Sequence, residues 1–269
     1  MPTSRPATEH PLADDTIKAA LVPLRSLARD WAEDAKRPDP IAGLRLFGKG
    51  SSGEGRARRA IKPPQPAHIT ALADGARTEA RDAILVAAAT GLRRGELFGL
   101  RWRDIDFTAN EIHVAAYNFA GKVEDGRFKT DAGERDVPLF KSIRKLLLER
   151  KARQRYKRPD DFVFATQVGT PIDPNNFVKR ELRAAVKAAN ETRAKAKQPA
   201  LPAFRWHDFR HYAVSMLIAQ KADILTLARI AGHADPNVTL KVYGHLMKGA
   251  LSEAAERFEP LAHMASKGA

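Results

Sequence analysis

Residues 207–246 have the sequence HDFRHYAVSMLIAQKADILTLARIAGHADPNVTLKVYGHL, in which apolar residues recur at helical spacing between turns marked by glycine, aspartate and proline. This pattern predicts three short helices, at His207–Gln220, Asp223–Ala231 and Pro236–Leu246. Positions 207 and 210 share one face of the first helix, and that edge is expected to border a groove because the neighbouring face is apolar. The polar residues of interest are His207, Arg210, His233 and Tyr243.

Two upstream residues complete a set that suits phosphodiester chemistry. Arg93 lies in ATGLRRGELFGLRWRDID (residues 89–106), and Lys129 lies in FKTDAGERDVPL (residues 128–139). A guanidinium group stays protonated and offers a planar fork of donors to phosphate oxygens, while a tyrosine hydroxyl can attack phosphorus. Lysine and histidine can move the protons. The set therefore predicts cleavage of a phosphodiester through a phosphotyrosine, without a metal.

Each of these residues also has an ordinary structural explanation. Arg93 could be a surface residue, as is expected of its neighbour Arg94. The pair Gly232-His233 could simply end a helix, since glycine is common at that position. Lys122 competes with Lys129, since solvated lysines are frequent on hairpins. The other tyrosines of the chain are Tyr117, Tyr156 and Tyr212.

The order of the motifs resembles the tyrosine recombinase (phage integrase) family over about Pro66 to Leu246. The shared pattern is TGLR followed by Glu, a hairpin lysine, H-x-x-R, G-H and a final tyrosine. The resemblance implies that Arg93 and Arg210 are the two catalytic arginines, which neutralise the phosphate oxygens. It also implies that Glu96 is the acid that supports the site.

The resemblance implies roles for the remaining residues as well. Tyr243 is similar to the nucleophile, His207 to the histidine that helps deprotonate it, and His233 to a histidine that hydrogen-bonds a phosphate oxygen. Lys129 is similar to the general acid that protonates the leaving 5′-oxygen. His211 is expected to pack or to lie beside the phosphate, without a chemical role.

Two departures from the family pattern concern the C-terminal helices. Tyr243 follows His233 by ten residues, whereas many members have nine, and the turn at Asp235 and Pro236 is expected to hold the extra residue. Lys221 stands where the family commonly has glycine. A positive φ at Lys221 would cost about 1 kcal/mol.

The rest of the pattern predicts a mainly helical α+β domain with a small antiparallel sheet, similar to a tyrosine recombinase catalytic domain. Strand-like alternation covers residues 111–119 and 135–140, and a sheet of about three strands is expected, with Lys129 near a turn. Residues 191–204 are expected to form a basic connector. Helical spacing predicts further helices at 15–36, 69–76, 79–90, 95–102, 142–156, 175–190 and 250–264.

The composition favours a polyanionic partner. The 269 residues include 46 Lys and Arg against 32 Asp and Glu, which gives a net charge of +14. The chain has no cysteine, which excludes disulfides and thiolate sites. It has no HExxH motif, Cys/His cluster or phosphate-cradling GxxxxGK[ST] motif, so neither a metal nor another cofactor is expected. No apolar run is long enough to cross a bilayer, and a cytoplasmic location is expected.

The domain organisation expected from the resemblance has three parts. Residues 1–48 are interpreted as a remnant of a helical core-binding domain, after a disordered lead at residues 1–14. Residues 49–65 are interpreted as a basic flexible linker. Residues 66–269 are interpreted as the catalytic domain. The short first part suggests a displaced start, a truncated remnant or a short variant.

The leading hypothesis is a site-specific DNA recombinase that cleaves and rejoins strands through a 3′-phosphotyrosyl intermediate. It would act on double-stranded DNA attachment sites, as a homotetramer and with possible accessory DNA-bending or directionality factors. One alternative is a DNA-binding remnant that no longer recombines. A type IB topoisomerase would use nearly the same residues, but the wording of the motifs is closer to the integrases. A basic helical protein without DNA chemistry leaves the ordered set of six residues unexplained.

Overall fold

The computed structural model describes residues 14–41, 62–126 and 133–247, with side chains from residue 21 onward. The chain forms two compact units, Met1–Arg59 and Ala60–Ala269. In the first unit, α1 (Asp14–Asp34) is the helix expected over residues 15–36. The expected lead at 1–14 and linker at 49–65 lie largely outside the described residues, and the helix expected at 250–264 lies wholly outside them.

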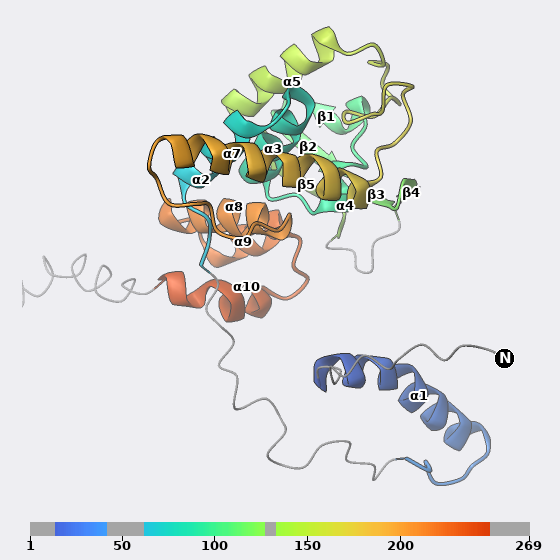
Figure 1. The fold of residues 1–269 in the computed structure, drawn as a ribbon. Coiled ribbons are helices and arrows are strands. Elements are labelled where there is room, and N and C mark those ends of the chain that lie inside the picture. The colour runs from blue at the N-terminus through green and yellow to red at the C-terminus, as the bar shows by residue number, and fades with distance from the viewer. Residues whose placement is uncertain (1–13, 42–61, 127–132, 248–269) are drawn as a thin grey trace, which may run out of the picture. The chain divides into compact units, whose positions relative to one another are not determined.

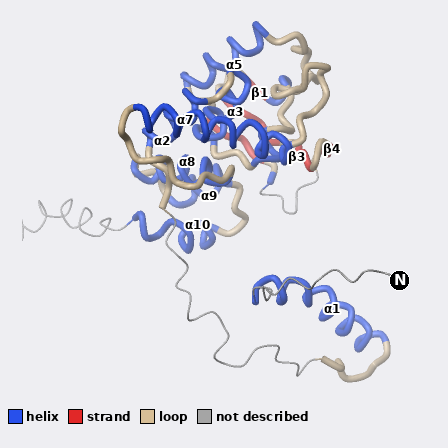
Figure 2. The backbone as a smooth tube through the Cα atoms, in the orientation of Figure 1, coloured by secondary structure: helices blue, strands red, loops and turns tan. Residues whose placement is uncertain are grey.

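The second unit is built from short helices around two small antiparallel sheets, which confirms the expected α+β class (Figure 1 and Figure 2). Single turns of 3₁₀-helix occupy Trp102–Asp104 and Gly244–Met247, and a π-helical turn occupies Val178–Leu182. The α-helices are α2 (Pro66–Gly75), α3 (Thr78–Thr90), α4 (Arg94–Leu97), α5 (Lys141–Arg153), α6 (Pro174–Phe177), α7 (Arg183–Lys195), α8 (His207–Ala219), α9 (Ile224–Ala231) and α10 (Pro236–Tyr243).

The strand expected over residues 111–119 is two strands in different sheets. One sheet has the order β1 (Ile105–Asp106), β2 (Glu111–Val114), β5 (Arg135–Pro138), and the other pairs β3 (Ala116–Phe119) with β4 (Lys122–Asp125). The chain changes partner at Ala115, whose carbonyl accepts a hydrogen bond from the Gly126 N–H. The sequence hides this change because positions 112, 114, 116 and 118 are all buried, so the alternation continues without a break.

The region between residues 173 and 204 also differs from expectation. The single helix expected at 175–190 consists of α6, the π-helical turn and α7, with Asp173 capping α6 by accepting from the Asn175 N–H at 2.7 Å. The connector expected at 191–204 is helical as far as Lys195. Its first residues, ETRAK, include strong helix formers, which favour extension of the helix.

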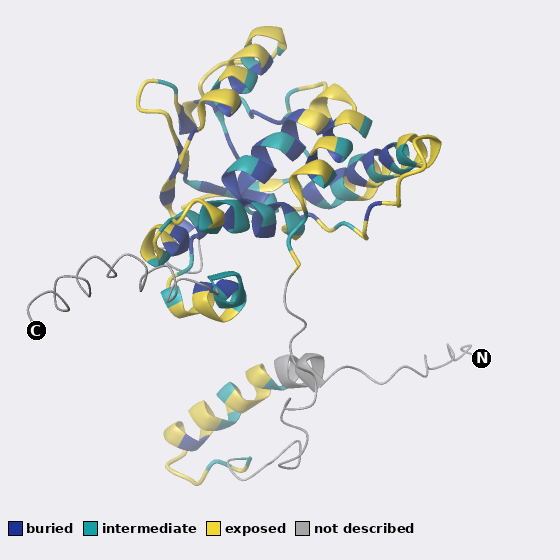
Figure 3. Ribbon diagram, turned by 90° about the vertical axis from the view of Figure 1, so that its left-hand side faces the viewer, coloured by how far each residue is buried: buried dark blue, intermediate teal, exposed yellow. Residues whose placement is uncertain are grey.

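An aromatic cluster fixes the start of α8 in the core. The ring of Trp206 lies 5.4 Å from that of Phe98 and 5.2 Å from that of Phe209, measured between centroids. Phe177 also contacts this cluster, at 4.6 Å from Phe98. In Figure 3 the buried residues gather along the inner faces of the helices and strands of this unit. Because Trp206 is anchored, the next residue, His207, is held at a defined place on the surface.

A second, smaller core joins the C-terminal helices. Val214, Leu227, Ala231 and Tyr243 form it, from α8, α9 and α10. These three helices are neighbours at one end of the unit in Figure 1, with α5 at the other end. The ring of Tyr243 is therefore part of the packing that holds α10 against α8 and α9.

Lys221 follows the end of α8 and lies in the left-handed region, with a φ of 61°. The Ala222 N–H donates to the Leu217 carbonyl at 3.1 Å and closes the turn. A side chain in this region costs about 1–2 kcal/mol, and glycine removes that cost while adding some entropy to the unfolded chain. We expect Lys221→Gly to raise the free energy of unfolding by about 0.5–1 kcal/mol in urea denaturation.

The control for this substitution lies one residue earlier. Gln220 has a φ of −86°, which suits any residue, so Gln220→Gly should lower the free energy of unfolding by about 0.5–1 kcal/mol. A comparable loss for both variants would show that the backbone at Lys221 is not strained.

Candidate active site

The site is built where α3, α8 and α9 meet, and two glycines end α3 and α9 there. Gly91 has a φ of 67° and Gly232 a φ of 60°, both in the left-handed region. Gly232 is also required for space, because a Cβ on it would lie 2.8 Å from Arg135 Nη1. The carbonyls at these helix ends have no partner within the helix and are available to side chains.

Three arginines bind these helix-end carbonyls. Arg210 donates to the carbonyls of Gly91, at 3.0 Å, and of Ala231. Arg93 Nη2 donates to the Gly232 carbonyl at 2.8 Å. In the same way, Arg135 Nε donates to the Ile230 carbonyl at 3.0 Å. The carbonyl end of a helix carries partial negative charge, so it suits cations and holds these guanidinium groups close together.

Glu96 ties two of the arginines to one carboxylate. Its side chain is 1% exposed, and its oxygens accept from Arg93 Nη1 at 2.7 Å and from Arg135 Nη2 at 2.9 Å. Burial alone would raise the pKa of Glu96, but the hydrogen bonds and charges of Arg135 and Arg93 outweigh it and lower the pKa to about 2. The carboxylate is therefore ionised and holds both guanidinium groups in place.

Arg210 does not border a groove as expected but is buried, at 2% exposure. Its guanidinium group faces inward because the ends of α3 and α9 offer carbonyl acceptors there. Burial and the charge of Arg93 lower the pKa of Arg210 to about 10, so it stays protonated at neutral pH. Only His207, one turn earlier on the same helix, is exposed on this edge.

Two histidines lie beside these arginines. His233 is half-buried and its Nδ1 lies 2.8 Å from Thr239 Oγ1. Burial and the charges of Arg210 and Arg93 lower its pKa to about 4, so it is neutral at pH 7. Partial burial of the ring and the same two arginines also lower the pKa of His207. Neutral imidazoles here can donate one hydrogen bond each without adding charge.

Tyr243 is buried beside Arg210, at 1% exposure. Its hydroxyl forms a 2.8 Å hydrogen bond with His211 Nδ1. Burial raises the pKa of Tyr243 to about 12, although the charge of Arg210 acts in the opposite direction. The helix α10, which carries Tyr243, begins at Pro236 after the cap residue Asp235.

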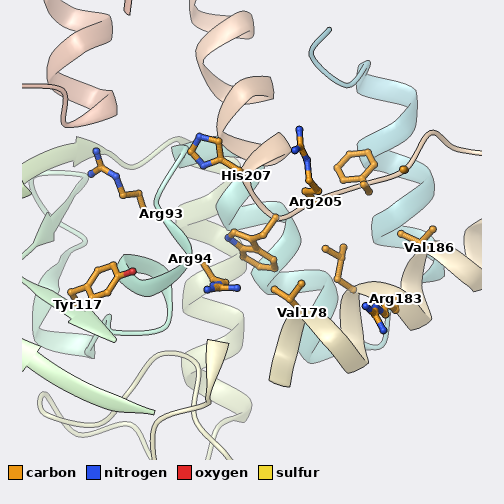
Figure 4. Close-up of a pocket in the computed structure, with 12 residues that line it drawn as sticks. Arg93, Arg94, Tyr117, Val178, Arg183, Val186, Arg205 and His207 are labelled. Atoms are coloured by element: carbon orange, nitrogen blue, oxygen red, sulfur yellow. The ribbon is translucent and has the colours of Figure 1, made fainter. Parts of the chain in front are cut away.

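A cleft of about 760 Å³ opens beside Arg93 and His207. Figure 4 shows both side chains on its border, with Arg94 and Tyr117 from α4 and β3 nearby and Arg183 on the opposite wall. The side chains of Arg94 and Arg183 form no ion pair or hydrogen bond with any other residue that the structure describes. Their uncompensated charge makes the cleft attractive to a polyanion.

The structure thus brings together six of the seven residues singled out in the sequence, with direct contacts or electrostatic coupling among them: Arg93, Glu96, His207, Arg210, His233 and Tyr243. Lys129 lies in residues 127–132, outside the described part of the chain.

Among the described residues there is no group of three or more His, Cys, Asp or Glu that could hold a metal ion. No helix within 14–41, 62–126 and 133–247 is both long and apolar enough to cross a membrane.

Arg135 was missed in the sequence, and so was the hydrogen bond between His211 and Tyr243. The sequence does contain a clue to Arg135. Side chains alternate between the two faces of a strand, so Arg135 lies on the same buried face as Val137 and Leu139, and a buried cation needs a partner. His211 lies on the same helix face as His207, one turn later, with ring centroids 4.7 Å apart. The sequence does not show that Tyr243, 32 residues away, is its partner.

Comparison with known proteins shows the family to which the chain is similar. Residues 62–249 match the model of the phage integrase family. The chain is 27% identical over 199 residues to a protein named "Tyrosine recombinase XerC-like" from Caldanaerobacter subterraneus subsp. tengcongensis, covering 66% of this chain and 48% of that protein. It is 30% identical over 184 residues to the ICEBs1 integrase of Bacillus subtilis (strain 168), covering 65% and 47%. The chain spans about half the length of the curated relatives it matches.

Solved structures show the same fold. The Tn1549 transposon integrase in complex with circular intermediate DNA superimposes with a TM-score of 0.70 at 21% identity, covering 92% of this chain and 81% of that one. A lambda integrase dimer bound to a COC' core site superimposes with a TM-score of 0.55 at 16% identity, covering 85% and 74%.

Proposed function

This chain belongs to the phage integrase family, and from that premise we propose that it cleaves and rejoins DNA strands through a covalent phosphotyrosine at Tyr243. The observation that carries the proposal is the contact of two arginines with one end of α9, next to the buried tyrosine. Arg93 and Arg210 donate to neighbouring carbonyls, of Gly232 and Ala231, so their guanidinium groups converge. The charge of Arg210 also acts on the phenol of Tyr243.

The proposed reaction exchanges one phosphate ester for another. Tyr243 Oη bonds to the scissile phosphorus while the bond from phosphorus to the 5′-oxygen breaks, so the strand segment that ends in the 3′-phosphate becomes attached to the protein. Arg93 and Arg210 stabilise the extra negative charge that develops on the phosphate oxygens. His207 and His233 lie beside these arginines and donate hydrogen bonds to the same phosphate oxygens. The hydroxyl proton of Tyr243 passes to a neighbouring histidine, and Lys129 supplies a proton to the 5′-oxygen.

The substrate proposed is a DNA duplex that carries an attachment site. Support comes from the net charge of +14 and from the cleft bordered by Arg94 and Arg183, whose charges are uncompensated among the described residues. As in the family, we expect four copies to act together on two duplexes, with accessory DNA-bending or directionality factors. In this organisation we propose that residues 66–269 are the catalytic domain, that residues 1–48 are a remnant of a helical core-binding domain, and that residues 49–65 are a basic flexible linker.

The test uses nicked duplexes with randomised sequence around the nick, so that the target site need not be known. The short strand released after attack diffuses away, and the covalent complex accumulates. We expect a protein–DNA adduct that survives denaturing electrophoresis and forms equally well in EDTA and without nucleotide, since the reaction conserves the ester bond. Loss of the adduct in EDTA with rescue by magnesium would point to metal-assisted chemistry and contradict the proposal.

Arg93→Lys is expected to slow adduct formation by about 100-fold or more, although the positive charge is kept. Lysine cannot reproduce the planar fork that binds Glu96, Gly232 and a phosphate oxygen at the same time, and loss of one such donor costs about 3–4 kcal/mol in the barrier. The rate of adduct formation under single-turnover conditions measures the effect.

Arg94→Lys is the matched control, one residue later in the chain. Arg94 borders the cleft without an ion pair or hydrogen bond to any other described residue, so its contribution is bulk charge, which lysine supplies. The two variants should therefore differ by about the full 100-fold. Equal rates would mean that Arg93 also contributes charge alone.

A further inference from the structure

On the basis of the proposed strand transfer, we propose that His211 is the side chain that accepts the hydroxyl proton of Tyr243 during attack. His211 follows Arg210 on α8 and is buried, at 9% exposure. Its Nδ1 lies 2.8 Å from Tyr243 Oη, a direct contact with the reacting atom. The two rings meet edge to face, with centroids 5.7 Å apart.

The hydrogen-bond pattern assigns the direction of this contact. A neutral imidazole has one nitrogen that accepts and one that donates. The Tyr243 hydroxyl forms no second hydrogen bond with the described residues. Among these residues, His211 Nδ1 is therefore the acceptor to which the hydroxyl can donate its proton. The remaining ring proton is then on Nε2. In this tautomer the free lone pair of Nδ1 faces the proton that must leave the phenol.

His207 is less well placed for the same task. It is exposed at the start of α8, and it forms no hydrogen bond with Tyr243 in the part of the chain that the structure describes. Its ring instead packs edge to face against His211, at 4.7 Å between centroids. His207 therefore lies between the cleft and His211, where it can bind the phosphate and shield the buried pair.

The surroundings of the pair explain why the proton stays on the tyrosine without DNA. Burial and the charge of His207, when protonated, lower the pKa of His211 to about 4, and burial raises the pKa of Tyr243 to about 12. A phosphodiester bound by Arg93 and Arg210 adds a negative charge beside His211, which favours the imidazolium. Attack then moves the proton from Oη to Nδ1 as Oη bonds to phosphorus, and the nucleophile becomes reactive only when DNA is bound.

His211→Asn separates proton acceptance from positioning. The amide oxygen of asparagine lies near the place of Nδ1, so the Tyr243 hydroxyl keeps a hydrogen-bond acceptor, but an amide cannot take up the proton. We expect the variant to fold and bind DNA like the wild type and to form the adduct on the nicked duplex pool about 100-fold more slowly or worse. His207→Asn, the same change one turn earlier, is the matched comparison.

A second readout uses 3-fluorotyrosine at position 243, whose hydroxyl is more acidic. If proton removal limits the His211→Asn variant, fluorination should speed that variant and leave the wild type and His207→Asn without such a gain. A structural role for His211 would not produce this rescue.

The outcomes are distinct. If His211→Asn forms the adduct at the wild-type rate, His211 only positions Tyr243. If it forms the adduct faster than the wild type, the contact with His211 restrains Tyr243. Either result overturns the proposal. Rescue by fluorotyrosine in His207→Asn alone would assign the proton to His207 and also overturn it. If the wild type forms no adduct at all, the proposed function fails together with this inference, whereas a wild-type adduct with an unaffected variant defeats the inference alone.

Discussion

Tyr243→Phe is expected to abolish covalent attachment to DNA while the protein still folds and binds DNA. Phenylalanine keeps the ring that packs against Val214, Leu227 and Ala231, and it removes only the attacking oxygen. The lost hydrogen bond to His211 Nδ1 should lower the free energy of unfolding by about 1 kcal/mol. Adduct formation on the nicked duplex pool, urea denaturation and DNA retention on a filter measure the three quantities.

The complementary variant leaves Tyr243 as the sole tyrosine of the chain. The sequence has four tyrosines, so replacement of Tyr117, Tyr156 and Tyr212 by phenylalanine achieves this. This triple variant should still form the adduct, since among the described residues no side-chain hydrogen bond joins any of the three to Arg93, Arg135 or Arg210. An adduct in Tyr243→Phe, or none in a well-folded triple variant, would move the nucleophile elsewhere.

Glu96→Gln is expected to lower the free energy of unfolding by about 3–5 kcal/mol at neutral pH. The amide has nearly the shape of the carboxylate but no charge, so the buried Arg135, whose side chain is 3% exposed, loses its counterion. Adduct formation should fall as well, because Arg93 loses the same partner. Urea denaturation measures the first effect and the nicked duplex assay the second.

Glu149→Gln is the control for this substitution. Glu149 is 58% exposed and lies 3.9 Å from Lys145, so its removal should change the free energy of unfolding by less than about 0.5 kcal/mol. A similarly small change in Glu96→Gln would show that Arg135 and Arg93 do not depend on the carboxylate.

The pH dependence of stability provides an independent check on Glu96. Its pKa in the folded protein is about 2, below the ordinary value of 4.5, so the ionised form stabilises the fold. That contribution, about 3 kcal/mol from the difference of about 2.5 pKa units, is complete above pH 4.5 and is lost as the pH falls toward 2. The difference in unfolding free energy between wild type and Glu96→Gln should therefore shrink steadily between pH 5 and pH 3.

Helices with long apolar periodicity were predictable from the sequence. The expected spans at 79–90 and 142–156 lie within a few residues of α3 and α5. The buried residues of α5 form one stripe, whereas α3 is buried on almost every side. The division of residues 111–119 between two sheets was not predictable. It depends on which strand pairs with each half, and the alternation of buried residues is the same in either arrangement.

The candidate residues were predictable as types and in order, but their contacts were not. The inward direction of Arg210 is set by the Gly91 carbonyl, 119 residues away in the chain. The position of the Arg135 side chain is fixed by its hydrogen bonds to Glu96, 39 residues away. Neither pairing can be recognised from the sequence around the residues involved. Local sequence shows which side chains could take part in the chemistry, and the packing of α3, α8 and α9 decides which of them meet.

The most direct measurement of the central claim is the identification of the modified residue. The wild-type adduct from the nicked duplex pool is digested with nuclease and protease, and the peptide that carries the residual nucleotide is sequenced by mass spectrometry. A 3′-nucleotide linked through phosphate to Tyr243 is the result expected if this side chain is the nucleophile. A nucleotide on any other tyrosine, or on a serine, histidine or lysine, would contradict the proposed chemistry.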